Sequence, residues 1–301
     1  MIRVGVLRGG TSPEYEQSLK TGAYILKNLP RDAYVPVDLF IDRDGLWHMG
    51  GVQVSTDTLK HRVDVIWNAL HGYYGEDGKV QQLLEGIGIP YIGSGPVPSA
   101  QTANRKLLKE KVSQLGIKTL RDVIVEDWGG AEPHVAAQHV VGEVFKKFSP
   151  PWNVFPMHGT HAGTSVRCAT RDELGALLTK MCELNVPVLI EEVIFGNNVH
   201  VVAMDTYRGK KGYTLMPSAR LTTDESKKLQ EVAAKIHAEF GLRHVSCTHA
   251  IITPRGHIYV CKMETVPQLH EDSAVHKGLE AVGSSFKKFA KHLIDAVVGR
   301  R

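Results

Sequence analysis

The chain has 301 residues, 43% of them hydrophobic and 23% charged, which is ordinary for a water-soluble globular protein with a sizeable core. Its 36 Lys and Arg against 32 Asp and Glu give a net charge of +4, too small to indicate nucleic acid or a membrane surface as a partner. No apolar run approaches the roughly 18 residues that a membrane span needs, and the N-terminus lacks a secretory signal pattern. We therefore expect a cytoplasmic protein.

The first 95 residues alternate predicted strands with predicted helices. Strands are predicted at 2–7, 34–42 and 63–70, and helices at 13–29 and 80–88. A small hairpin is predicted between the second and third strands. This alternation predicts an α/β fold with a doubly wound parallel sheet. Ligands of such sheets bind at the carboxyl ends of the strands, where the loops "RGGTSPE" and "HGYYGEDG" lie. Either loop taken alone could equally be only a tight turn.

The pattern changes near residue 120, where a smaller α+β unit is predicted. Its short strands are expected at 121–126, 141–148, 153–157, 187–194 and 197–206, with a helix at 171–185 among them. An amphipathic helix, an antiparallel hairpin and a closing helix follow, at 224–241, 243–264 and 282–298. The predicted domains are therefore 1–95, 96–210 and 211–301.

Four cysteines, Cys168, Cys182, Cys247 and Cys261, show no CxxC spacing. This usage is typical of reduced thiols in a cytosolic protein. Cys247 and Cys261 lie on the two strands of the late hairpin. We expect that they could face each other there, so a disulfide between them is the alternative to reduced thiols, and it is the less favoured one.

Three stretches, in this order along the chain, resemble the D-alanine–D-alanine ligases: "GGTSPEYEQSL", "ALHGYYGEDGKVQQLLEGIGIPYIGSGPVPSA" and "GHIYVCKMETVP". These are ATP-grasp enzymes of peptidoglycan synthesis. The resemblance is strongest over the first 115 residues and weaker in the ATP-binding half. It implies an ATP-grasp fold behind the N-terminal parallel-sheet domain, and a dimer formed through that domain. It also implies that ATP and magnesium phosphorylate the carboxylate of one D-alanine, which the amine of a second then attacks.

The substrate side of the site matches the family pattern. The resemblance assigns Glu14 to the ammonium of the first substrate, and Ser18 lies on the helix that follows. His71 is assigned to the substrate carboxylate, and Ser273 stands at a substrate-binding serine position. Gly72, Gly75 and Gly78 would permit close backbone approach, while Glu76 and Asp77 are expected to shape their loop. Without the resemblance, Glu14 would be an acid at a helix start and His71 a loop histidine.

The nucleotide side departs from the pattern. The positions implied for ATP are Arg105, Gly159, Thr160, Gly163 and Glu191. Arg105 replaces the first ATP lysine and keeps its charge but not its geometry. Phe155 replaces the second lysine, and Asn198 replaces the acid that would hold the ribose. The long loop that would close over the intermediate is missing from "YTLMPSARLTTDES".

The metal positions depart most. The family places an aspartate, a glutamate and an asparagine where this chain has His249, Lys262 and Glu264. Magnesium prefers hard oxygen ligands, and an ammonium a few ångströms away repels it by several kcal/mol. We therefore expect Lys262 to fill or cancel a metal position. Alternatively it pairs with Glu264, or holds a nucleotide phosphate without metal.

Two further family positions are also altered, since an arginine is replaced by Cys247 and a glycine by Gln268. Three hypotheses remain open: an active ligase with an unusual nucleotide and metal site, a pseudoenzyme, or a zinc protein. The pseudoenzyme, which we favour, would bind a small D-alanine-like ligand as a homodimer, or regulate a catalytic paralogue by dimerising with it. The zinc hypothesis would use four histidines: His158, His161, His249 and His270.

Overall fold

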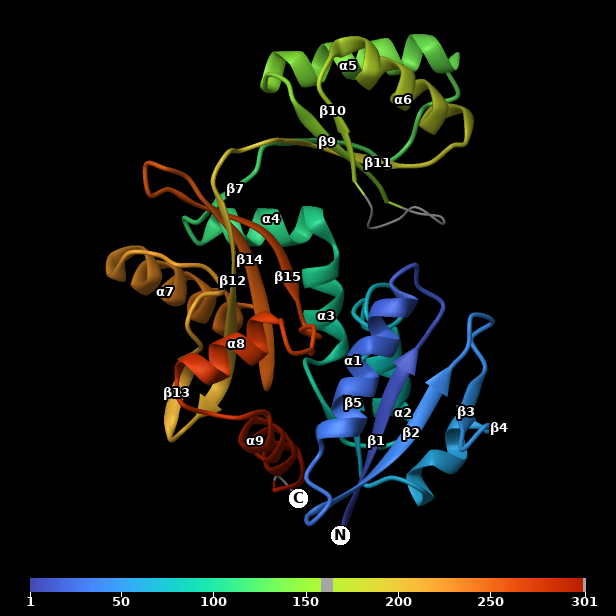
Figure 1. Cartoon of the computed structure of the whole chain (residues 1–301). Coiled ribbons are helices and arrows are strands. Elements are labelled where there is room, and N and C mark those ends of the chain that lie inside the picture. The colour runs from blue at the N-terminus through green and yellow to red at the C-terminus, as the bar shows by residue number, and fades with distance from the viewer. Residues whose placement is uncertain (158–164, 300–301) are drawn as a thin grey trace. The chain divides into compact units, whose positions relative to one another are not determined.

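The computed structural model describes residues 1–157 and 165–299. The chain divides into two compact units (Figure 1). The first joins Met1–Ile117 to Asn197–Arg301, and the second is Lys118–Gly196. Each unit is described by itself below. No helix within the described ranges is long and apolar enough to cross a membrane.

The N-terminal part of the first unit is a six-stranded sheet in the order β4-β3-β2-β1-β5-β6. Its strands are β1 (Ile2–Gly9), β2 (Tyr34–Ile41), β3 (Trp47–Met49), β4 (Val52–Gln53), β5 (Val65–Asn68) and β6 (Tyr91–Ile92). β2, β1, β5 and β6 run parallel, whereas β3 and β4 are antiparallel. The predicted parallel sheet and its small hairpin are thus confirmed.

Helices cover both faces of this sheet. Successive side chains of β1 point to opposite faces, so they pack against different helices. Val4 and Val6 share one core with Ile25 of α1 (Tyr15–Asn28), and Leu7 shares another with Leu84 of α2 (Lys79–Gly86). Three short elements complete this part of the chain: the 3-10 helix η1 (Thr56–His61) and the helices α3 (Pro96–Ala103) and α4 (Arg105–Gln114). The sheet is therefore doubly wound, as predicted.

A second sheet of the first unit contains the late hairpin. β12 (Asn197–Tyr207), β13 (Lys210–Thr214), β14 (Val245–Ile252) and β15 (Ile258–Glu264) pair antiparallel in the order β13-β12-β14-β15. Residues 215–222 alone connect β13 to α7 (Thr223–Glu239), so the connection is short, as expected. Thr222 and Glu225 form a capping box that fixes the start of α7.

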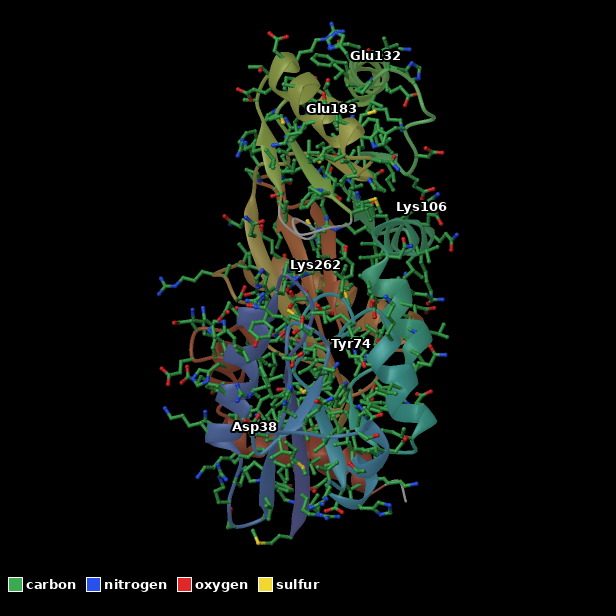
Figure 2. The ribbon with its side chains drawn as sticks, turned by 90° about the vertical axis from the view of Figure 1, so that its right-hand side faces the viewer. Asp38, Tyr74, Lys106, Glu132, Glu183 and Lys262 are labelled. Carbon is green, nitrogen blue, oxygen red and sulfur yellow. The ribbon has the colours of Figure 1, made fainter. Side chains whose placement is uncertain are left out.

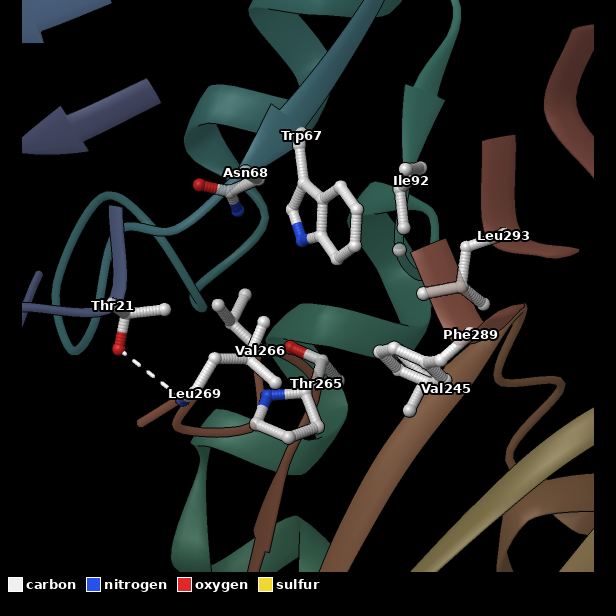
Figure 3. Close-up of a pocket in the computed structure, with 12 residues that line it drawn as sticks. Thr21, Trp67, Asn68, Ile92, Val245, Thr265, Val266, Leu269, Phe289 and Leu293 are labelled. Carbon is white, nitrogen blue, oxygen red and sulfur yellow. Dashed lines mark hydrogen bonds between the residues drawn. The ribbon is translucent and has the colours of Figure 1, made fainter. Parts of the chain in front are cut away.

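The two sheets of the first unit share one core. It includes residues of β1, β5, β12 and β14, together with α8 (Ala274–Ala281) and α9 (Phe286–Val298). Trp67 of β5 stacks on Phe286 at a ring separation of 5.8 Å. A cavity of only about 20 Å³ remains beside Trp67 and Phe289, where the backbone N–H of Leu269 donates to Thr21 Oγ1 (Figure 3). This packing fixes the late hairpin relative to the N-terminal loops.

The second unit is a four-stranded antiparallel sheet with two helices. Its elements are β7 (Lys118–Thr119), β8 (Asp122–Val125), α5 (Pro133–Lys147), β9 (Trp152–Pro156), β10 (Val166–Cys168), α6 (Arg171–Glu183) and β11 (Val188–Glu192). The sheet order is β10-β9-β11-β8.

The predicted strand at 141–148 is wrong, because residues up to Lys147 belong to α5. Ala137, Val140, Val141 and Val144 are buried at helical spacing, and Glu132 caps the helix start. The apolar run was too short to separate a strand from a helix by periodicity.

Candidate active site

The substrate-side residues come together at the carboxyl ends of β1 and β5. The backbone N–H of His71 donates to Ser18 Oγ at 2.8 Å, and His71 Nε2 lies 2.8 Å from Thr21 Oγ1. Ser18 and His71 are both buried. Polar side-chain atoms of Glu14, His71 and Glu76 lie within 4.8 Å of one another. The loop beginning at Leu70 thus presents its acid and imidazole to Glu14.

Close packing explains the glycines of this loop. A Cβ at Gly75 would lie 2.2 Å from the carbonyl oxygen of Leu70, which no side chain tolerates. Gly78 has a φ of +92°, and its Cβ would meet the carbonyl oxygen of Pro96 at 2.4 Å. Glu76 Oε2 accepts a hydrogen bond from the backbone N–H of Gly72 at 2.8 Å. Glu76 therefore shapes the loop, as expected.

Burial determines the charge of His71 and Glu76 in this loop. It lowers the pKa of His71 to about 4, so the imidazole is neutral at pH 7. It raises the pKa of Glu76 to about 8, although the ammonium of Lys262 opposes the shift. Near neutral pH, Glu76 is thus mostly protonated, and the contact of Glu14 with a substrate ammonium stays a prediction.

The three metal positions lie on one face of the hairpin formed by β14 and β15. Cys247 is directly opposite Glu264, and His249 is opposite Lys262. Positions two apart on a strand share a face, so all four side chains project together. On the neighbouring strand β12, His200 is opposite His249, and their ring centroids are 4.0 Å apart. Figure 2 labels Lys262 among the side chains of the first unit.

The expectation that Cys247 and Cys261 could face each other is wrong. Cys247 pairs in register with Glu264, and Cys261 falls at the register shift between His249 and Ala250. The extra residue of a bulge has no partner directly opposite it on the other strand. All four cysteines lie in the described part of the chain, and none of them forms a disulfide.

An internal charge network occupies the hairpin face. Lys262 Nζ lies 3.2 Å from Glu264 Oε1, and His249 Nε2 lies 3.2 Å from Glu264 Oε2. Burial alone would raise the pKa of Glu264, but His249, Lys262 and His71 outweigh it and hold that pKa well below its ordinary value. Burial would lower the pKa of Lys262, but Glu264, Glu76 and Glu14 raise it above its usual range. The pair is therefore ionised.

Magnesium does not fit this arrangement. Of the three family metal positions, Glu264 alone offers an oxygen ligand, and its carboxylate already faces one ammonium and one imidazole. An octahedral ion needs several hard oxygen ligands, and the charge on Lys262 repels it. The pairing of Lys262 with Glu264 was among the sequence alternatives. The family roles of these positions stay predictions.

A cavity of about 230 Å³ opens beside the hairpin face. Its lining includes His249, Glu264, Gln268, His270 and Ser273. Ser273 Oγ donates to the carbonyl oxygen of His270 at 2.7 Å and accepts from the backbone N–H of His276 at 3.2 Å, which caps α8. Ser273 thus has a structural role at the cavity wall, and its predicted substrate contact stays a prediction.

The predicted nucleotide residues are divided between the units. Arg105 begins α4 and Asn198 lies on β12 in the first unit, whereas Phe155 and Glu191 lie on β9 and β11 in the second. The remaining positions, Gly159, Thr160 and Gly163 with His158 and His161, are outside the described residues. The ATP site therefore stays a prediction.

The sequence interpretation missed three features of the site. It treated Cys247 as a lost arginine, it passed over His200, and it did not foresee that Glu76 would be protonated. The strand alternation of "NNVHVV" and "VSCTHA" carried a signal for the first two, because it places alternate residues on one face. The register between β12 and β14 was needed to bring them together.

Comparisons with known proteins agree with this architecture. Residues 49–94 match the model of the D-ala D-ala ligase N-terminus, and residues 204–295 match that of the C-terminus. The D-alanine–D-alanine ligase of Aquifex aeolicus is 30% identical over 97% of this chain and 100% of its own length. That of Geotalea uraniireducens is 27% identical over 98% of this chain and 95% of its own.

Solved structures show the same fold. D-alanyl-alanine synthetase A of Vibrio cholerae matches with a TM-score of 0.85 and 22% identity, over 100% of this chain and 99% of its own. The Bacillus anthracis D-alanine–D-alanine ligase complexed with ATP matches with a TM-score of 0.77 and 22% identity, over 100% and 98% of the two chains.

The parallel-sheet domain and the two antiparallel lobes define an ATP-grasp fold, as the sequence resemblance implied. More particularly, the chain belongs to the D-alanine–D-alanine ligase family.

Proposed function

We propose that this family member has lost, or largely lost, ATP-dependent joining of two D-alanines and retains a pocket for a small amino-acid zwitterion. The observation that carries the proposal is the ion pair between Lys262 and Glu264 on the hairpin face where the family holds its metal. A protein cation there satisfies the carboxylate, so magnesium and the phosphates it would carry lose their binding site.

The ligand half of the proposal rests on the N-terminal loops. Glu14 is a partly exposed carboxylate beside a neutral His71, an arrangement suited to a substrate ammonium and carboxylate respectively. Ser18 holds the backbone of His71 and so positions its ring. The ligand would be D-alanine or a similar small amino acid, as in the family.

An active ligase is the second candidate, favoured by the 30% identity to the Aquifex aeolicus ligase over its whole length. It would require ATP and a metal to bind despite Lys262. The pseudoenzyme alternative covers a binding module or a regulator of a catalytic paralogue, with dimerisation through the N-terminal domain as part of that proposal.

We expect the purified protein to form no ADP and no dipeptide above background with ATP, magnesium and D-alanine, while the Aquifex aeolicus relative run alongside turns over. D-alanine should still raise the melting temperature of the wild type. Glu14→Gln should abolish that shift, and Glu16→Gln, which removes an exposed neighbouring carboxylate, should not. ADP and dipeptide formation in proportion to enzyme would contradict the loss of ligation, and an unchanged shift in Glu14→Gln would contradict the assigned pocket.

A further inference from the structure

The hairpin face that does not fit magnesium has the donor atoms of a different metal. Cys247, His249 and Glu264 each point one ligand atom to the same place, and these atoms lie within 4.8 Å of one another. A thiolate, an imidazole and a carboxylate are ligands that zinc accepts and magnesium does not prefer as a set.

The spacing is close to that of a tetrahedral ion. Zinc–nitrogen and zinc–oxygen bonds of about 2.0–2.2 Å separate the two ligand atoms by roughly 3.4 Å. His249 Nε2 and Glu264 Oε2 lie 3.2 Å apart. Cys247 is directly opposite Glu264 across the hairpin and two residues from His249, so its sulfur lies on the same face.

One buried polar atom of this face, His249 Nε2, lacks a hydrogen-bond partner among the described residues. Its approach to Glu264 Oε2 is close without hydrogen-bond geometry. A buried nitrogen left in this way is costly unless something else binds it. Because Lys262 contacts the other carboxylate oxygen, Oε1, the oxygen Oε2 remains directed at the imidazole.

We propose that Cys247, His249 and Glu264 bind one Zn²⁺ ion. The fourth coordination position faces the cavity of about 230 Å³ that all three residues line, which leaves it accessible to water or a small anionic ligand. His200 packs against the ring of His249 and fixes its orientation. Lys262 orients the Glu264 carboxylate through Oε1, as outer partners of metal ligands commonly do.

The charges of the site balance with zinc bound. The thiolate of Cys247 and the carboxylate of Glu264 neutralise Zn²⁺, and the thiol proton leaves when the metal binds. The ammonium of Lys262 repels zinc as it repels magnesium, but the thiolate, a ligand that zinc accepts and magnesium does not prefer, supplies the extra negative charge that offsets this repulsion. This site differs from the four-histidine hypothesis, since it needs neither His158 nor His161.

The test is a titration of the metal-free full chain with Co²⁺, a spectroscopic substitute for Zn²⁺. We expect one equivalent to bind, with a thiolate-to-cobalt charge-transfer band in the near ultraviolet and visible bands of four-coordinate intensity. Cys247→Ser should lose the charge-transfer band, whereas Cys261→Ser, a thiol on the same hairpin, should keep it. His249→Ala should bind at least tenfold more weakly, and Zn²⁺ should displace the cobalt.

Three results would each overturn the proposal: cobalt binding without a thiolate band, equal cobalt affinity in Cys247→Ser and wild type, or no cobalt binding at micromolar concentration. A second measurement on the wild type avoids dependence on variants that fail to fold. Zinc should slow alkylation of Cys247, followed by peptide mass spectrometry, and leave the rate at Cys261 unchanged. Equal rates at Cys247 with and without zinc would overturn the proposal.

Discussion

Replacing Lys262 with methionine is expected to lower the free energy of unfolding by about 2–3 kcal/mol. Removing one partner of a buried ion pair typically costs about 3–5 kcal/mol, because it leaves the other charge unpaired. The side chain of Glu264 is only 5% exposed, whereas the side chain of Lys262 is 35% exposed. Solvent around the ammonium screens the ion pair and reduces the expected figure. Methionine preserves most of the packing of the lysine stem, so the loss reports mainly on charge.

Urea denaturation near pH 7 measures this loss. Lys262→Arg keeps the charge and should cost less than half as much. The double variant Lys262→Met with Glu264→Gln removes both charges and should recover most of the stability, giving a coupling free energy above about 1 kcal/mol. If Lys262→Met unfolds within about 0.5 kcal/mol of wild type, the ion pair does not hold this face together.

Glu76→Gln should make the stability of the protein fall less as pH rises from about 4.5 to about 8. The pKa of Glu76 rises from 4.5 to about 8 on folding, mainly through burial. A carboxyl whose folded pKa is raised contributes its full stability below pH 4.5 and loses it as pH rises through about 8. The groups that act on it are Lys262, which opposes the shift, and Glu264 and Glu14, which add to it; the nearby His71 is neutral at pH 7.

From about pH 5.5 to 8.5 the wild type should lose roughly 3 kcal/mol more stability than Glu76→Gln, at about 1.36 kcal/mol per pKa unit. Glutamine can still accept the hydrogen bond from Gly72. Glu110→Gln, which removes an exposed carboxylate of α4, is the matched control and should follow the wild-type profile. Parallel stability profiles for wild type and Glu76→Gln would show that Glu76 is ionised in the folded protein at neutral pH.

Much of the fold could be predicted because its elements carry local signals. The alternation of short apolar strands with helices defined the parallel sheet, and the turn "TPRG" defined the late hairpin. The segment at 141–148 failed because its valines suit either a strand or a helix, and the outcome depends on which face packs against β8 and β9.

The site was predicted in part for a related reason. The spacing of Lys262 and Glu264 on one strand placed both on one face without knowledge of the partner strand. The charge state of Glu76 depends on burial beneath the hairpin, and the alignment of Cys247 with Glu264 depends on strand register. Both are properties of contacts between distant parts of the chain, so no local pattern reveals them.

Calorimetric titration of ATP into the protein with excess magnesium, with and without D-alanine, tests most directly whether Lys262 has replaced the metal. We expect no heat of binding that depends on magnesium up to millimolar ATP, and the same result when D-alanine is present. If ATP binds at micromolar to low millimolar concentration and this binding disappears when magnesium is withheld, Lys262 has not replaced the metal, because the altered hairpin still forms a nucleotide–metal site.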